Sequence, residues 1–110
     1  MGLSESQRNR CISILDTLQS YSISKMFAQP VDPDRDNVPN YFNSVKKPMD
    51  LGTVRTKLMN DEYNSIAEWK EDMDLIWNNS LLVNSKRSIL GIITLDMQSK
   101  YQSLVKFLTD

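Results

Sequence analysis

The chain has 110 residues, of which 13 are Lys or Arg, 14 are Asp or Glu and none is His, so its formal net charge is -1. This length supports one hydrophobic core and leaves no room for a second domain, and the balanced charge gives no excess positive potential to attract nucleic acid or anionic lipid. Zinc sites built from Cys and His, His-dependent triads and intrachain disulfides are excluded, because Cys11 is the only residue of these types. No stretch approaches 18 uninterrupted apolar residues. We therefore expect a single domain over residues 1–110 that uses no cofactor or metal, contacts no membrane and binds no nucleic acid directly.

The first two predicted helices cover residues 4–21 and 50–59. Ser4 and Gln7 can form a capping box at the start of the first, and Asp50 can serve as the N-cap of the second. Their buried faces are indicated by apolar residues spaced three and four apart. These are Cys11, Ile14, Leu15 and Leu18 in the first helix, and Leu51, Val54 and Leu58 in the second.

The third and fourth predicted helices cover residues 65–83 and 88–108, with a short polar break between them. The expected buried stripe of the third contains Ile66, Trp69, Met73, Ile76, Trp77 and Ser80, and that of the fourth contains Leu90, Ile93, Met97, Tyr101, Leu104 and Leu108. Gly91 lies inside the fourth helix, where it costs about 1 kcal/mol relative to Ala, and nothing in the sequence accounts for it. No alternating strand pattern is present, so the predicted fold class is all-α, a four-helix bundle.

A long segment, residues 22–49, separates the first two helices and contains all four prolines. Structureless connections longer than about 12–15 residues are mostly functional or disordered. This segment has apolar side chains to bury, which a disordered linker lacks. They are Phe27, Val31, Val38, Tyr41, Phe42, Val45 and Met49. We interpret the segment as the wall of a binding site.

Four short motifs in this chain resemble those of the bromodomain family. They are Gln29-Pro30-Val31-Asp32, Val38-Pro39-Asn40-Tyr41-Phe42, the run from Lys47-Pro48-Met49-Asp50 through Leu51-Gly52-Thr53-Val54, and Trp77-Asn78-Asn79-Ser80 ahead of Asn84. Each motif is weak alone, but their order and spacing make the resemblance specific, and it covers residues 4–108. It implies a left-handed four-helix bundle with a long loop between helices 1 and 2, and a module that reads acetylated lysine without catalysing a reaction.

The resemblance also implies a role for individual residues. Asn84 matches the asparagine whose side-chain NH2 donates to the acetyl carbonyl, and Tyr41 matches the tyrosine whose hydroxyl holds a water bridging to the same oxygen. Val31 and Val38 match the apolar wall, and Phe27 matches the aromatic residue at the mouth. Leu90 matches the gatekeeper that narrows the entrance, with Ile89 as the alternative if the break differs by one residue. Val83 and Pro30 complete the implied site.

A site of this kind selects acetyl-lysine for a physical reason. Acetylation converts a strongly hydrated ammonium into a neutral amide, so an apolar slot that ends in one donor suits the modified side chain. The unmodified ammonium would be desolvated while facing a donor, and even an unpaired neutral polar group costs roughly 1–3 kcal/mol. One small side chain with one or two hydrogen bonds predicts an affinity of roughly millimolar to micromolar.

The chain departs from the family pattern at the rim of this site. Lys25 and Met26 stand where the family often has Trp and Pro ahead of Phe27, Val83 replaces the common tyrosine before the asparagine, and Asp36 stands where an apolar residue is frequent. Two hypotheses stay open: an acetyl-lysine reader, or a bromodomain-like interaction module whose degenerate pocket has lost that ligand. An apolar, water-filled pocket would favour the first hypothesis, and a collapsed pocket or a loop side chain lying on Asn84 would favour the second.

Two further alternatives concern single features. Asn84 could simply end the third helix, since Asn is common beyond helix termini. An enzyme would need an acid-base pair or a nucleophile in a cleft, whereas the acidic residues here are scattered over helix faces and the loop.

The expected partners follow from the same resemblance. They are acetylated lysine peptides, histone tails in particular, bound by a nuclear module of a larger chromatin-associated protein. Asp32, Asp34 and Asp36 could attract a peptide rich in Lys and Arg, and the salt dependence of peptide affinity after neutralising Asp34 and Asp36 tests this.

Overall fold

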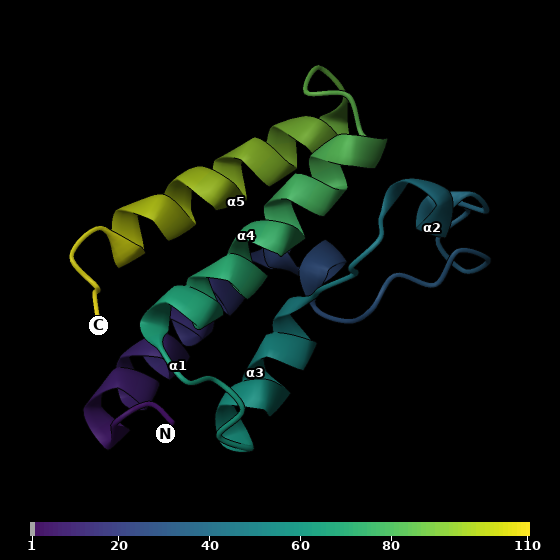
Figure 1. Ribbon diagram of the computed structural model, residues 1–110. Helices are drawn as coiled ribbons and strands as arrows, with labels where there is room; N and C mark the ends of the chain where they lie inside the picture. The colour runs from purple at the N-terminus through teal and green to yellow at the C-terminus, as the bar shows by residue number, and fades with distance from the viewer. Residues whose placement is uncertain (1) are drawn as a thin grey trace.

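The computed structural model describes residues 2–110, which form a helical bundle about 39 Å long. Its elements are α1 (Glu5–Gln19), the 3-10 helix η1 (Ser22–Phe27), α2 (Tyr41–Ser44), α3 (Leu51–Met59), α4 (Ile66–Val83) and α5 (Ile89–Val105). In Figure 1 the four long helices pack together, while the chain around α2 projects from one side. No strand occurs in residues 2–110, which confirms the all-α prediction.

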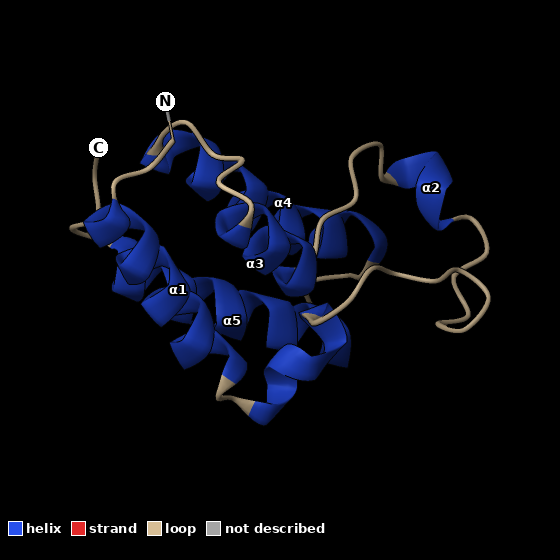
Figure 2. Cartoon of the chain, turned by 90° about the horizontal axis from the view of Figure 1, so that it is seen from below, coloured by secondary structure: helices blue, strands red, loops and turns tan. Residues whose placement is uncertain are grey.

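Both ends of the described chain lie at the end of the bundle away from α2 (Figures 1 and 2). Among the helices of residues 2–110, none combines the length and hydropathy needed to span a bilayer. The segment predicted as one long loop contains η1 and α2, so it is more regular than its proline content suggested.

Polar side chains fix where the helices begin. Ser4 and Gln7 form the predicted capping box, with Ser4 Oγ accepting from the Gln7 backbone N–H at 3.1 Å and Gln7 Oε1 accepting from the Ser4 N–H at 2.9 Å. Asp50 caps α3 by accepting from the Thr53 N–H at 2.8 Å, and Ser88 caps α5 by accepting from the Gly91 N–H at 3.0 Å. These contacts satisfy N–H groups that the first turn of a helix leaves without intrahelical partners.

The core contains the apolar stripes predicted for the first three long helices. Trp69 and Trp77 are both fully buried in α4, and each has its ring about 6 Å from that of Tyr101 on α5. The stripe predicted for α5 is wrong in part, because Leu90 and Leu104 are 45% and 38% exposed.

Gly91, Thr94 and Val105 take the place of those leucines on the buried face of α5, beside the predicted Met97 and Tyr101. Gly91, Thr94, Met97, Tyr101 and Val105 are the buried residues of that helix. A Cβ on Gly91 would overlap the Ser85 carbonyl oxygen, so the turn formed by residues 84–88 rests directly on the first turn of α5. This close approach explains why Gly91 occupies a helical position that Ala would favour by intrinsic propensity.

Hydrogen bonds anchor both ends of the long loop to the bundle. At the start of the loop, the Ala28 carbonyl accepts from the Gly52 N–H at 3.1 Å, and a Cβ on Gly52 would lie 2.6 Å from that oxygen. At the other end, Asn79 Nδ2 donates to the Lys47 carbonyl at 2.9 Å. Gly52 therefore allows the loop backbone at Ala28 to approach α3 closely.

Candidate functional site

A pocket of about 360 Å³ lies between the long loop and the neighbouring ends of α4 and α5. It is lined from η1 by Lys25, Met26 and Phe27, from the loop and α2 by Gln29, Val31, Arg35, Asp36, Val38, Tyr41, Met49 and Asp50, from α4 and its end by Ile76, Ser80, Val83 and Asn84, and from α5 by Leu90. Segments distant in sequence thus converge on one concave site, which is typical of a ligand pocket.

Seven of the predicted site residues lie together on the wall of this pocket. They are Asn84, Tyr41, Val31, Val38, Phe27, Leu90 and Val83. Pro30 does not line it: this residue is exposed, and its carbonyl accepts from the Arg35 guanidinium at 3.1 Å. Ile89, the alternative to Leu90, is 78% exposed and outside the lining. The ligand-binding roles of these residues stay predictions.

The resemblance implied that Phe27 lies at the mouth of the pocket, but the structure places it deeper. It is only 6% exposed, and its ring packs edge-on against Trp77 with the centroids 5.2 Å apart. The last turn of η1 directs this side chain toward the bundle, so Phe27 contributes to the inner wall and ties the pocket to the core.

Asn84 is both the C-cap of α4 and a pocket residue. Its backbone N–H donates to the Ser80 carbonyl at 2.9 Å, and its extended φ and ψ of -119° and 125° turn the chain out of the helix. Its side-chain Nδ2 donates to Ser80 Oγ at 3.2 Å. The helix-ending role and a ligand-binding role are therefore compatible, because the carboxamide has a second N–H and a carbonyl oxygen.

Tyr41 opens α2 and is 6% exposed although it belongs to the projecting part of the chain. Its ring packs edge-on against Phe42, with centroids 5.4 Å apart. Burial raises the pKa of the Tyr41 phenol above its ordinary value of 10.0. At neutral pH the hydroxyl is therefore protonated and can both donate and accept a hydrogen bond.

The loop segment 30–38 is held in shape by its own polar groups. Asp32 Oδ1 accepts from the N–H groups of Asp34 and Arg35, and Asp36 Oδ2 accepts from the Asp32 N–H at 3.0 Å. Asn37 takes φ 57°, a left-handed conformation that Asn tolerates. This local folding keeps Val31 and Val38 on the same wall of the pocket.

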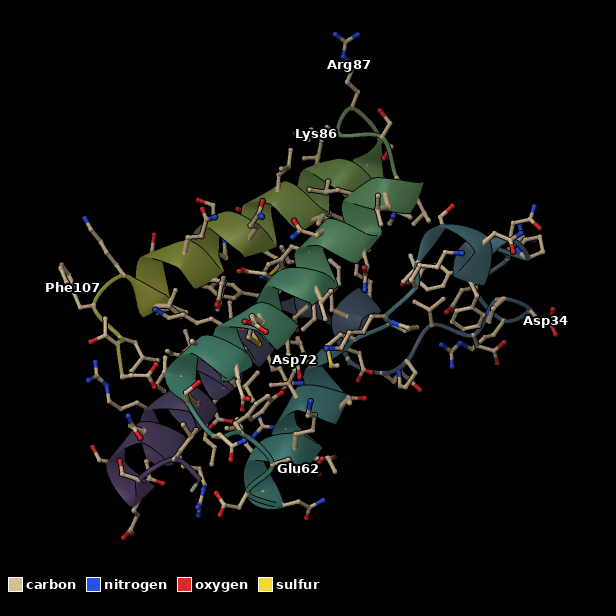
Figure 3. All side chains as sticks on the ribbon, viewed as in Figure 1. Asp34, Glu62, Asp72, Lys86, Arg87 and Phe107 are labelled. Atoms are coloured by element: carbon tan, nitrogen blue, oxygen red, sulfur yellow. The ribbon has the colours of Figure 1, made fainter. Side chains whose placement is uncertain are left out.

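Only part of the acidic cluster in this loop is available to a basic partner. Arg35 Nε lies 3.0 Å from Asp36 Oδ1, and this hydrogen-bonded pair lowers the pKa of Asp36. Asp34 extends from the outer end of the loop, away from the helices (Figure 3). Attraction of a Lys- and Arg-rich peptide stays a prediction. Neutralising Asp34 alone tests it cleanly, because neutralising Asp36 would also remove hydrogen bonds that hold the loop in shape.

The sequence prediction did not assign several lining residues to the site. Ile76 and Ser80 precede Asn84 by two helical turns and one, so a spacing of four along α4 was the available signal. Met49 and Asp50 join the wall because the chain enters α3 there. Arg35 could not have been assigned, since its position depends on the loop's internal hydrogen bonds.

The departures from the family pattern at Lys25 and Met26 leave the pocket open. Lys25 is exposed and Met26 half-buried, and both line the pocket rim. The side chain hydrogen-bonded to the Asn84 carboxamide is that of Ser80 in α4, and not one from the loop. Within residues 2–110, no group of three or more His, Cys, Asp or Glu residues is arranged to hold a metal ion. The pocket geometry thus favours the reader hypothesis over a degenerate pocket.

Comparisons with known proteins agree with this geometry. A family model described as Bromodomain matches residues 11–95. The SWR1 complex bromodomain subunit bdf1 of Schizosaccharomyces pombe is 36% identical over 109 residues, which are 99% of this chain and 19% of that protein. Transcription factor GTE10 of Arabidopsis thaliana is 42% identical over 74 residues, which are 67% of this chain and 7% of that protein. The chain thus spans less than a fifth of the length of these relatives.

A solved structure has the same fold. The second bromodomain of Candida albicans Bdf1, bound to an imidazopyridine, superimposes with a TM-score of 0.87 and 28% sequence identity, covering 93% of this chain and 99% of that one. The family match covers more than half of the chain, and the two relatives are a bromodomain subunit of the SWR1 complex and a transcription factor. The chain therefore belongs to the bromodomain family, whose members are non-enzymatic modules that read acetylated lysine.

Proposed function

We propose that this bromodomain binds acetylated lysine in histone tails, as one module of a longer nuclear protein that acts on chromatin. The single observation that carries the proposal is Asn84 at the wall of an otherwise largely apolar pocket, with one N–H used by Ser80 and the second available to a ligand. Relatives support the wider context, because one is a bromodomain subunit of the SWR1 complex and another is a transcription factor.

In this proposal the acetyl-lysine enters between the loop and α5. Asn84 donates to the acetyl oxygen, and the Tyr41 hydroxyl holds a water that bridges to the same atom. Val31 and Val38 pack against the lysine methylenes, Phe27 bounds the inner end, and Leu90 and Val83 border the entrance. An unmodified lysine is rejected because its ammonium would lose its hydration while facing a donor.

The test is a calorimetric or NMR titration with acetylated and matching unacetylated histone-tail peptides. Wild type should bind only the acetylated peptide, with a dissociation constant of roughly millimolar or below. Asn84→Ala should weaken binding at least about tenfold, because a buried acetyl oxygen would lose its donor. Asn78→Ala is the matched control, since Asn78 is an exposed residue of α4 outside the pocket lining. Equal binding of both peptides, or unchanged affinity in Asn84→Ala, would overturn the proposal.

A further inference from the structure

Two buried hydroxyl groups lie behind Asn84, where α4 packs against α5. Ser80 Oγ accepts from Asn84 Nδ2 at 3.2 Å and lies 2.7 Å from Thr94 Oγ1. Thr94 Oγ1 in turn donates to the Leu90 carbonyl at 2.8 Å. Ser80 and Thr94 are 8% and 0% exposed, so bulk water cannot easily replace either contact. A continuous chain of hydrogen bonds thus runs from the pocket wall into α5.

The Leu90 carbonyl, at the α5 end of this series of hydrogen bonds, sets the direction of the others. The Leu90 carbonyl can only accept, and the Thr94 hydroxyl has a single proton, which it donates to that carbonyl. Either oxygen could donate across the 2.7 Å contact, but the Thr94 hydroxyl keeps both of its hydrogen bonds only if the proton between the two hydroxyls comes from Ser80. Ser80 Oγ consequently has only lone pairs left to offer to Asn84, and it can accept from an N–H but cannot donate to an oxygen.

This direction selects one orientation of the Asn84 carboxamide. If the amide rotated by half a turn, its oxygen would face the lone pairs of Ser80 Oγ and lose the hydrogen bond seen at 3.2 Å. In the observed orientation, one N–H is bonded to Ser80 and the second N–H is held as a donor for the pocket. That donor is the group that an acetyl oxygen needs.

We propose that Ser80 and Thr94 are positioning residues that fix the donor orientation of Asn84 and thereby increase the affinity for acetyl-lysine. The inference rests on the proposed role of Asn84 in binding. Since apparent affinity scales with the fraction of molecules in the competent state, an Asn84 side chain free to rotate binds more weakly. Neither residue needs to touch the ligand through its hydroxyl for this effect.

The test uses four substitutions and two measurements. Ser80→Ala removes the acceptor, Thr94→Val removes the second hydroxyl while keeping side-chain shape, and Thr94→Ser keeps the hydroxyl. Thr56→Val is the matched control, because Thr56 donates to a carbonyl four residues earlier in α3, at 3.1 Å, outside the pocket lining. The measurements are affinity for an acetylated histone-tail peptide and the NMR order parameter of Asn84 Nδ2 in the free protein.

Ser80→Ala and Thr94→Val should each weaken peptide binding by about threefold or more and lower the Asn84 order parameter. Thr94→Ser and Thr56→Val should stay within about twofold of wild type. The double variant Ser80→Ala/Thr94→Val should bind no more weakly than Ser80→Ala, because both substitutions interrupt the same chain.

The inference is overturned if Thr94→Val and Ser80→Ala keep both the wild-type affinity and the wild-type order parameter while Asn84→Ala loses binding; the proposed function then stands. If wild type binds no acetylated peptide, the proposed function fails instead. The order parameter still decides the positioning role in that case, because it is measured without ligand, and an unchanged value in both variants contradicts it.

Discussion

At the scale of single residues, Gly91 is where the turn formed by residues 84–88 packs against α5. A side chain there would overlap the Ser85 carbonyl oxygen, which a rigid turn cannot vacate cheaply. We predict that Gly91→Ala lowers the free energy of unfolding by about 1–2 kcal/mol, since overpacking against rigid backbone costs about 2–3 kcal/mol and the higher helix propensity of Ala recovers about 1 kcal/mol. Urea unfolding followed by circular dichroism provides the measurement.

Ser99→Ala is the control for this prediction, because Ser99 is an exposed residue in the middle of the same helix. There Ala should be neutral or stabilising by a few tenths of a kcal/mol. The displaced turn also carries Asn84, so Gly91→Ala should weaken acetyl-lysine binding while Ser99→Ala should not. If Gly91→Ala were as stable as wild type, the turn would not depend on contact with α5.

The motifs shared with the bromodomain family predicted the location of the pocket better than the placement of single side chains within it. The family resemblance assigned Asn84 and Leu90 to the site, and both lie on the pocket wall. Phe27 could not be placed at the right depth, because its position depends on the 3-10 turn that η1 makes and on the Trp77 ring. Ser80 was predicted to be buried in the core, and it is. Its hydroxyl also forms a hydrogen bond with Thr94 on α5, which no local sequence pattern identifies.

At the scale of elements, one buried carboxylate joins α3, α4 and the end of the long loop. Asp72 is 3% exposed and lies between α3 and α4 (Figure 3). Its Oδ2 accepts from Lys57 Nζ and from the Tyr63 hydroxyl, each at 2.7 Å, and Lys47 Nζ lies 3.8 Å from Oδ1. Burial and the Asp72 charge both raise the pKa of Tyr63, so its hydroxyl stays a donor at neutral pH.

We predict that Asp72→Asn destabilises the domain by about 1–3 kcal/mol, because hydrogen bonds to a charged, buried acceptor are lost or weakened. Asp96→Asn is the matched control. Asp96 pairs with Lys100 one turn along the surface of α5, at 2.9 Å, with side chains 50% and 30% exposed. Removing that charge should cost no more than about 0.5 kcal/mol. Urea unfolding of both variants in the same buffer makes the comparison, and equal losses would contradict a special role for Asp72.

The elements themselves were largely predictable, and α5 shows where prediction failed. Apolar periodicity identified each long helix, because a helix must bury one face. The α5 stripe was assigned to the larger residues Leu90 and Leu104, whereas the helix turns Gly91 and Thr94 inward. Close packing against the turn and against Ser80 selects small residues there, and a pattern based on hydrophobicity alone does not detect such selection.

At the scale of the whole molecule, the bundle provides a rigid base and the loop provides one wall of the site. The loop is attached at both ends through Gly52 and Asn79, while its middle is held by its own hydrogen bonds. The bundle follows from sequence periodicity, but the course of the loop depends on many weak polar contacts over short distances. Family resemblance, and not periodicity, is therefore what located the ligand site in the sequence.

The absence of His has a consequence for the whole domain: no side chain has an ordinary pKa between about 6 and 8. We predict that the free energy of unfolding is nearly constant across that range and falls above pH 9. Burial raises the pKa of Cys11 from 9.0 to about 12 in the folded state. Burial also raises the pKa of Tyr63 and of Tyr101 above the ordinary value of 10.0.

The sign follows from proton counting. Above pH 9 the Cys11 thiol of the unfolded chain loses its proton while the buried thiol keeps it until about pH 12. The unfolded state then binds fewer protons, so stability declines as pH rises, by at most about 1.4 kcal/mol per pH unit for each such group. Urea unfolding from pH 6 to 10.5 measures this decline. Cys11→Ala should lower the whole curve through a core cavity but flatten it between pH 9 and 10, before the tyrosines titrate. An unchanged slope in that interval would show that the decline does not come from Cys11.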